Sequence, residues 1–142
     1  MRTQETAKRI DAALRRRAAQ HFAGVDKYRR ACYYFLAHCG AVVHPGDSVL
    51  AKLDDTAAEP LGDRWDEHRA ELDALPVVTE KYAALGRITA DALVEELQRV
   101  PPVLLAEGRS REELAAAVRG HTARSFANIG EYVSEGGSVE AL

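Results

Sequence analysis

The chain has 142 residues and a formal net charge of −3, and this length fits one domain better than two independent cores. Hydrophobic residues make up 46% and charged residues 29%, a balance typical of globular proteins and not of disordered chains. The sequence has no run of about 18 apolar residues, and its basic N-terminus lacks the apolar stretch of a secretory signal. We therefore expect a cytoplasmic protein that does not enter a membrane.

The average charge hides an uneven distribution along the chain. Residues 1–30 contain nine Lys or Arg and three acidic residues, a balance of +6, whereas residues 31–142 hold ten and nineteen, a balance of −9. Arginine side chains that bind phosphates, beside aromatic rings that stack on bases, are typical of single-strand binding. We therefore interpret the chain as a non-enzymatic binding or assembly subunit, without a cofactor, whose basic helix contacts nucleic acid or an acidic protein partner. The expected contact residues are Arg9, Arg15, Arg16, Arg17, Lys27, Arg29 and Arg30.

The same charges fit a second interpretation, in which the arginines pair with acidic side chains and not with a ligand. Residues 31–142 supply those acids, either within one chain or between copies in a homo-oligomer or larger complex. A wide apolar face expected on residues 28–43 fits burial inside one chain and burial between copies equally well.

The first segment of the chain predicts helix. Apolar residues recur every three to four positions through residues 10–43, which is the helical period. Gly24 indicates a break into two helices. Proline and glycine within residues 44–47 end the helical stretch, because proline cannot continue the hydrogen-bond ladder. An irregular connection around residues 44–62 follows.

Proline, glycine and capping residues divide the middle of the chain. An apolar stripe from Trp65 to Leu75 leads to Pro76, which we expect either to kink that helix or to open the next one. Gly86 is the expected stop of that next helix. Thr89 is the expected N-cap of a further helix, which ends before the two prolines at residues 101–102.

The last helix has the clearest start signal. Ser110 and Glu113 have the spacing of a capping box, so we expect a helix from there to about Val133. The complete pattern predicts an all-α, single-domain helical bundle of about five to six helices. We expect the domain to cover residues 1–135 and residues 136–142 to form a flexible C-terminal tail.

Three histidines, His38, His68 and His121, fall on the apolar stripes of three different expected helices. Imidazoles that meet inside a bundle can bind iron or zinc. The phrases FLAHCGAVV, WDEHRAELDAL and AAVRGHTARSF resemble the ligand helices of the hemerythrin-like (HHE) family, whose bundles bind two irons through histidines and carboxylates. That family has a glutamate four residues after histidine on two helices, where this chain has Val42 and Ser125. The resemblance therefore implies a degenerate metal-binding bundle; the alternative is three partly buried histidines bonded to neighbouring carbonyls or carboxylates.

A third hypothesis rests on Arg16 and His21. Their Arg-x4-His spacing resembles the catalytic pattern of HEPN-fold ribonucleases, and the phrase YRRACYYFLAH is similar to helices of that superfamily. The resemblance implies that Arg16 positions a phosphate while His21 moves a proton during attack by a ribose 2′-hydroxyl. The family usually has a polar residue directly after the arginine, and this chain has Arg17.

Overall fold

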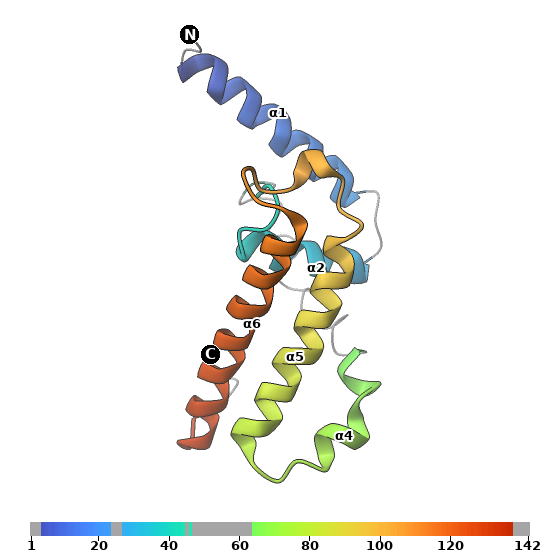
Figure 1. The fold of residues 1–142 in the computed structure, drawn as a ribbon, viewed down its shortest axis with the longest axis vertical. Coiled ribbons are helices and arrows are strands. Elements are labelled where there is room, and N and C mark those ends of the chain that lie inside the picture. The colour runs from blue at the N-terminus through green and yellow to red at the C-terminus, as the bar shows by residue number, and fades with distance from the viewer. Residues whose placement is uncertain (1–3, 24–26, 45, 47–63, 138–142) are drawn as a thin grey trace.

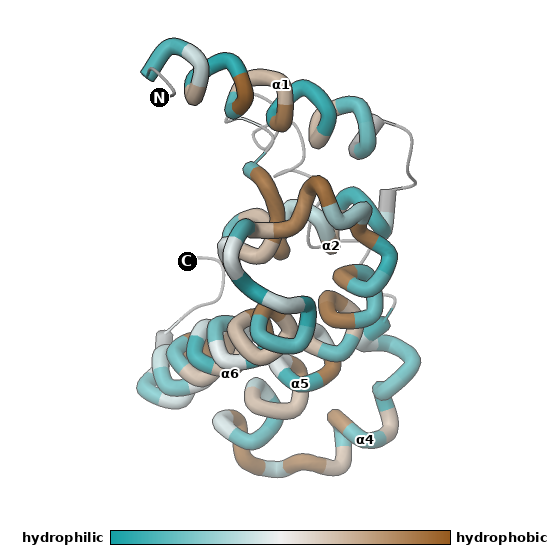
Figure 2. Tube along the Cα trace, turned by 45° about the horizontal axis from the view of Figure 1, so that its top comes forward, coloured by the Kyte–Doolittle hydropathy of each residue, from teal (hydrophilic) through white to brown (hydrophobic). Residues whose placement is uncertain are grey.

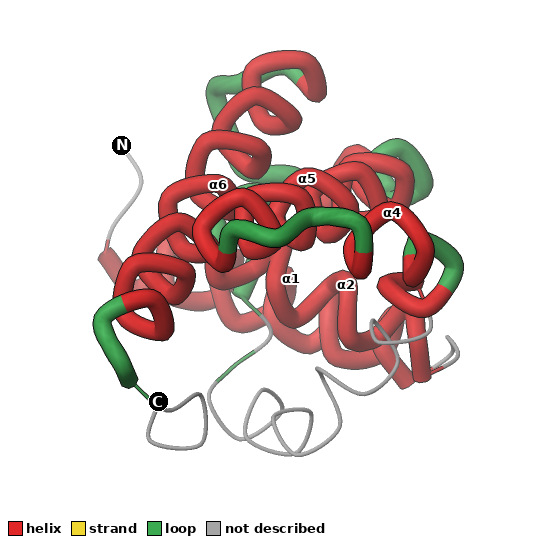
Figure 3. Tube along the Cα trace, turned by 90° about the horizontal axis from the view of Figure 1, so that it is seen from below, coloured by secondary structure: helices red, strands yellow, loops and turns green. Residues whose placement is uncertain are grey.

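The computed structural model of the chain describes residues 4–23, 27–44, 46 and 64–137 (Figure 1). Within these ranges the regular structure is helical, which confirms the predicted all-α class (Figure 3). The helices are α1 (Gln4–Ala23), α2 (Lys27–His38), α4 (Arg69–Asp73), α5 (Val78–Leu97), the 3₁₀ helix η1 (Pro102–Leu104) and α6 (Arg111–Ser134). Most of the expected irregular connection at residues 44–62 lies outside the described residues.

Helices α5 and α6 form the centre of the fold as an antiparallel pair (Figures 1 and 3). Helix α2 packs on α5 near one end of the pair, and α4 lies against the other half of α5. The main core gathers where α2, α5, η1 and α6 meet, and a smaller core joins α4 to α5. The largest fully buried side chains are Tyr33, Leu36, Leu93, Leu97, Leu104, Leu114, Val100, Val118 and Cys32.

Helix α1 is attached to the rest of the molecule by one end. Residues 4–11 are all exposed, while Ala18 is fully buried near the contact between α1 and η1. Figure 2 shows α1 as mostly hydrophilic and set apart from the other helices. The expected division of the N-terminal segment agrees with the end of α1 at Ala23 and the start of α2 at Lys27; Gly24 itself lies outside the described residues. None of the described helices is long and apolar enough to span a membrane.

Helix α2 ends at His38, earlier than the expected end near residue 43. Gly40 adopts a positive φ of 75°, and its N–H donates to the carbonyl of Ala37 while the N–H of Ala41 donates to the carbonyl of Leu36. These two bonds form a Schellman motif, which satisfies the last carbonyls of the helix. The glycine, and not the proline that follows, therefore ends this helix.

The chain after Gly40 pairs with the segment that follows η1. The N–H of Val43 donates to the carbonyl of Leu104 at 2.8 Å, and the N–H of Ala106 donates to the carbonyl of Ala41 at 3.0 Å. Val42 and Leu105 form the isolated antiparallel bridge between them. This pairing fixes the C-terminal end of α2 against the connection between α5 and α6.

The expectation of two helices separated at residues 86–89 is wrong. Helix α5 runs without interruption from Val78 to Leu97. Gly86 is a packing residue, because a Cβ atom there would lie 2.9 Å from the Cβ of Phe126 on α6. Thr89 is no N-cap: its hydroxyl donates to the carbonyl of Leu85, one turn earlier in the same helix. Glycine and threonine are both common at helix ends, but here tertiary contacts place Gly86 and Thr89 in the middle of a helix.

Both ends of α6 show regular caps. The Ser110 hydroxyl accepts from the N–H of Glu113, and the Glu113 carboxylate accepts from the N–H of Ser110, which confirms the capping box. At the other end, Gly136 and Gly137 donate to the carbonyls of Val133 and Tyr132 in a second Schellman motif. The structure therefore describes the first two residues of the expected flexible tail as the cap of α6, and residues 138–142 lie outside the described part.

Candidate functional site

The expected basic contact surface is exposed along α1. Arg9 forms an ion pair with Glu5 at 3.0 Å and Arg15 forms one with Asp11 at 2.8 Å, both between residues four apart on the helix. Arg16 and Arg17 are exposed as well. Exposed pairs of this kind contribute little to stability, so these arginines are not required to hold α1 in place.

Arg29 and Arg30 of α2 are partly buried, unlike the arginines of α1. Arg29 Nε donates to the Glu96 carboxylate at 2.8 Å, and the Glu96 side chain is only 5% exposed. Arg30 is half-buried, and its Nε has no hydrogen-bond partner among the described residues. The Lys27 side chain lies outside what the structure describes. The +6 segment is therefore divided: α1 presents its arginines to solvent, whereas Arg29 pairs with an acid of the same chain.

The structure separates the two residues of the ribonuclease hypothesis. Five helical positions place Arg16 and His21 about 140° apart around α1. Arg16 is exposed, whereas His21 is half-buried with its ring centroid 5.5 Å from that of the buried Tyr33. One copy of α1 therefore presents them on different faces.

The three histidines of the metal hypothesis do not lie at one site. His38 and His121 line the same cavity, but His68 is not among the residues that line it. His68 Nδ1 instead lies 3.3 Å from a carboxylate oxygen of Glu71. Within the ranges that the structure describes, no group of three His, Cys, Asp or Glu is placed to hold a metal ion.

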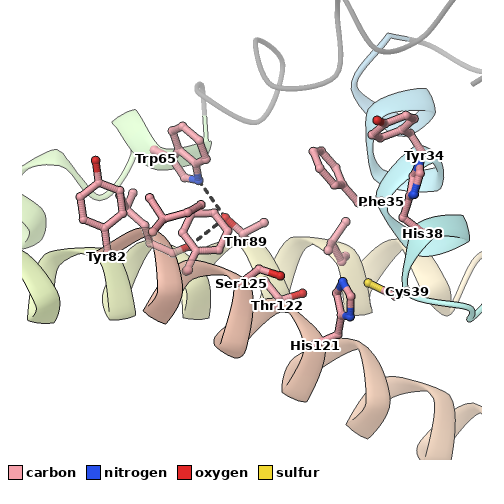
Figure 4. Close-up of a pocket in the computed structure, with 14 residues that line it drawn as sticks. Tyr34, Phe35, His38, Cys39, Trp65, Tyr82, Thr89, His121, Thr122 and Ser125 are labelled. Carbon is pink, nitrogen blue, oxygen red and sulfur yellow. Dashed lines mark hydrogen bonds between the residues drawn. The ribbon is translucent and has the colours of Figure 1, made fainter. Parts of the chain in front are cut away.

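His38 and His121 share a cavity lined by residues of α2, α5 and α6. It has a volume of about 580 Å³ and lies between α2, α5, α6 and the indole of Trp65 (Figure 4). Its aromatic residues are five of the nine in the chain. The lining residues are Tyr34, Phe35, His38, Cys39, Trp65, Tyr82, Leu85, Thr89, Leu93, His121, Thr122, Ser125, Phe126 and Ile129.

Helical spacing explains how three segments supply one lining. Helix α6 contributes residues 121, 122, 125, 126 and 129, and α5 contributes residues 82, 85, 89 and 93. Helix α2 contributes residues 34, 35 and 38, followed directly by residue 39, and the spacing in each set is that of one helix face. At about 1.5 Å per residue, the α6 residues extend roughly 12 Å along the cavity. The site is therefore an elongated cavity that follows the axis of α6.

Trp65 is held in a defined orientation at one end of the cavity. Its indole Nε1–H donates to Thr89 Oγ1 at 3.0 Å, while the Thr89 hydroxyl donates to the carbonyl of Leu85 at 2.8 Å. The Trp65 ring also meets the Phe126 ring edge to face, with centroids 6.4 Å apart. The polar edge of the indole is thus satisfied inside the protein, which leaves its apolar surface to line the cavity.

The polar groups of the cavity are unevenly placed. Figure 4 shows His38, Cys39 and His121 toward the α2 end, and Trp65 and Tyr82 toward the opposite end. Asp, Glu, Lys and Arg do not occur among the described lining residues. The site therefore combines an aromatic region around Trp65 and Tyr82 with two imidazoles and a thiol nearer to α2.

Cys39 is the nucleophile candidate of this cavity, but its environment favours the thiol. Burial raises the pKa of the Cys39 thiol, and a hydrogen bond with Thr122 offsets part of that effect. A thiol is a weak nucleophile compared with a thiolate. Neither Cys32 nor Cys39 forms a disulfide within the part of the chain that the structure describes. We therefore assign Cys39 a lining role and no chemical step.

The cavity was not predicted from the sequence. Its signal was present in the pairs Tyr34–Phe35 and His38–Cys39, which repeat after four residues on one helix face. Comparisons with protein-family models, curated proteins and solved structures found no match for this chain. The resemblances to hemerythrin-like proteins and to HEPN-fold ribonucleases therefore stay predictions.

Proposed function

We propose that this chain binds a small, largely apolar molecule in the cavity between α2, α5 and α6. The observation that carries the proposal is the set of five aromatic side chains around a space of about 580 Å³. Ligand sites of drug-sized molecules have volumes of this order and the same mixture of apolar walls and few polar groups.

The energetic argument is that of apolar surface removed from water. Each square ångström of apolar ligand surface buried contributes roughly 25 cal/mol, and aromatic pairs add a preference for flat, ring-containing ligands. The bond between Trp65 and Thr89 fixes the indole before a ligand arrives. Binding then costs less conformational entropy than it would with a mobile ring.

A neutral fluorescent probe tests the proposal directly. N-phenyl-1-naphthylamine is apolar, uncharged and brightens when it leaves water, and the single tryptophan at position 65 provides a second, intrinsic signal. We expect saturable binding to the full chain. A flat titration with both signals would contradict the proposed function.

Two substitutions on α6 separate binding in the cavity from binding elsewhere. Ser125→Phe places a ring inside the cavity, and Ala127→Phe places the same ring on an exposed position of the same helix. We expect Ser125→Phe to weaken probe binding on the order of tenfold or more, and Ala127→Phe to leave it unchanged. Equal effects of both substitutions would locate the probe outside the cavity.

The exposed arginines of α1 favour a second candidate function, the contact with a polyanion expected from the charge distribution. Residues 4–23 carry five Lys or Arg against two acids. Most of the described side chains of this helix are exposed and do not pack against other elements. We propose single-stranded nucleic acid as the first partner to test. An acidic protein partner is the alternative.

Fluorescence anisotropy with a labelled single-stranded oligonucleotide tests this second candidate. We expect the affinity to fall with salt, with a slope of about 0.7 for each phosphate contact, and to be lost in the Arg16→Glu/Arg17→Glu variant. The Arg109→Glu/Arg124→Glu variant makes the same change of charge at two other exposed positions and is expected to bind normally. An equal loss of affinity in both variants would show that binding depends on the net charge of the protein and not on the arginines of α1.

A further inference from the structure

The two ends of the cavity differ in ways that constrain a ligand. At the α2 end, His38 and His121 are exposed and bear ring nitrogens, whereas Trp65 and Tyr82 lie toward the other end (Figure 4). Leu93 and Thr122, which also line the cavity, are buried. A ligand that fills this space therefore has one end among imidazoles beside water and its body among aromatic rings.

We propose that the ligand is an amphiphile with a flat apolar body and a terminal carboxylate, and that the carboxylate lies between His38 and His121. This inference rests on the proposed function, because it names the chemical class of the molecule that the cavity takes. The apolar body then extends along α6 toward Trp65 and Tyr82.

Two features of the α2 end favour an anion. Imidazole N–H groups donate hydrogen bonds to a carboxylate, and a protonated imidazole adds a charge-assisted bond. A nearby polar donor is the hydroxyl of Ser125, which lines the cavity one turn after His121 on the same helix. The His38 ring also lies near two other rings: its centroid is 4.6 Å from that of Tyr34 and 6.1 Å from that of His44.

The lining also disfavours the other head groups. A cationic head would find no carboxylate among the described lining residues. The cost of removing it from water would then be offset only by contact with the faces of aromatic rings. A purely apolar end would make no hydrogen bond to the imidazoles at this end, so it would gain nothing from them. The exposure of both histidines matters as well, because a carboxylate at that position keeps part of its hydration while the body is buried.

A series of three ligands with one skeleton tests this inference by displacing bound N-phenyl-1-naphthylamine. The series is 1-naphthaleneacetate, 2-(1-naphthyl)ethanol and 2-(1-naphthyl)ethylammonium, which differ in the head group. We expect the acetate to displace the probe at a concentration at least tenfold lower than the alcohol, and the ammonium to be the weakest. Equal displacement by acetate and alcohol, or strongest displacement by the ammonium, would overturn the inference.

Histidine variants test the position of the carboxylate. In His38→Gln/His121→Gln, both side chains stay polar but lose the imidazole, and we expect the preference for acetate over alcohol to fall to within about threefold. His68→Gln removes a histidine outside the cavity and is expected to keep the full preference. An unchanged preference for acetate in the double variant would show that the carboxylate does not bind between the two imidazoles. If the neutral probe itself fails to bind, the proposed function fails; if it binds without a head-group preference, only this inference fails.

Discussion

The Cβ atom of Phe126 on α6 lies 2.9 Å from the point where a Cβ atom would stand on Gly86 of α5. The reverse arrangement occurs one turn away, where the Tyr82 Cβ lies 3.0 Å from the corresponding point on Gly130. Each helix thus places an aromatic residue against a glycine of the other. Both aromatic side chains also line the cavity, so the close approach of the helices and the shape of the site have the same origin.

Gly86→Ala is expected to destabilise the protein although alanine favours helix. The added methyl group overpacks against the Phe126 Cβ, at a cost of about 1–3 kcal/mol, while the gain in helix propensity is about 1 kcal/mol. We expect a net loss in the free energy of unfolding of up to about 2 kcal/mol, measured by urea denaturation.

Gly120→Ala is the matched control on α6. A Cβ atom at that position would meet only the flexible end of Arg124 at 3.4 Å. We therefore expect Gly120→Ala to stabilise the chain by up to about 1 kcal/mol. A gain in stability for both variants would show that Gly86 is not needed for the packing of α5 on α6.

Removal of the Arg29 guanidinium is expected to cost about 2–4 kcal/mol in the free energy of unfolding. Arg29→Met leaves Glu96, which is 5% exposed, without its 2.8 Å partner, and breaking a buried pair from one side is costly. Arg99 lies 3.7 Å from the same carboxylate, which places the expected loss at the lower part of the usual range.

Two comparisons check that interpretation of Arg29. Arg9→Met breaks an exposed pair with Glu5 and is expected to change stability by no more than about 0.5 kcal/mol. Arg29→Met/Glu96→Leu removes both charges and is expected to recover most of the loss, because no carboxylate is left buried alone. A double variant as unstable as Arg29→Met would contradict the role given to Glu96.

Thr89→Val is expected to reduce stability by about 1–2 kcal/mol and to change the emission of Trp65. The substitution removes the oxygen that accepts from the indole N–H and leaves that group without this partner. Steady-state fluorescence of the single tryptophan together with urea denaturation measures both effects. Thr79→Val, at an exposed position in the first turn of α5, is expected to change neither; an unaltered Trp65 signal in Thr89→Val would contradict the bond.

Stability is expected to decrease in alkaline solution. Burial raises the pKa of the Tyr33 hydroxyl far above its ordinary value, and burial also raises the pKa of Tyr28 and Cys39, with partial offsets from Arg64 and Thr122. A raised pKa in the folded state means that the folded protein holds its proton more tightly. The free energy of unfolding therefore keeps its full value below the pKa values of the unfolded chain, about 8.5 for Cys and 10 for Tyr. It decreases as the pH rises above those values.

Tyr33→Phe tests the largest part of that dependence. Urea denaturation between pH 7 and 11 is expected to give a shallower decrease for Tyr33→Phe than for the natural chain above about pH 10. Tyr132→Phe changes an exposed tyrosine and is expected to keep the original slope. Identical slopes for all three proteins would assign the alkaline loss to other groups.

Local signals in the sequence predicted those parts of the fold that depend on local interactions. The capping box at Ser110 is satisfied within four residues of chain, so its spacing was enough to place the start of α6. The same kind of reasoning failed at Gly86 and Thr89, because their roles are set by Phe126 and Trp65 on other segments. A glycine that admits a neighbouring helix and a glycine that ends its own helix look alike in sequence.

The candidate site was beyond local reasoning for a related physical reason. Each helix shows only a short apolar face, and the cavity exists because three such faces and one indole meet without filling the space between them. His38 and His121 were singled out by their apolar stripes as metal-ligand candidates, and the structure places both in the lining of one cavity. His68 had the same pattern, but its ring nitrogen lies beside Glu71.

The pairing between Val42 and Leu105 has a consequence for the order of folding. These residues are about sixty positions apart in the chain, and their bridge fixes the end of α2 that carries His38 and Cys39. Contacts across such a separation are slow to form, because closing the intervening loop costs conformational entropy. The segment that follows α2 can therefore gain this pairing only after residues 104–106 have been synthesised, and a chain ended before residue 105 would lack the bridge to Val42 and the bond from Ala106 to Ala41.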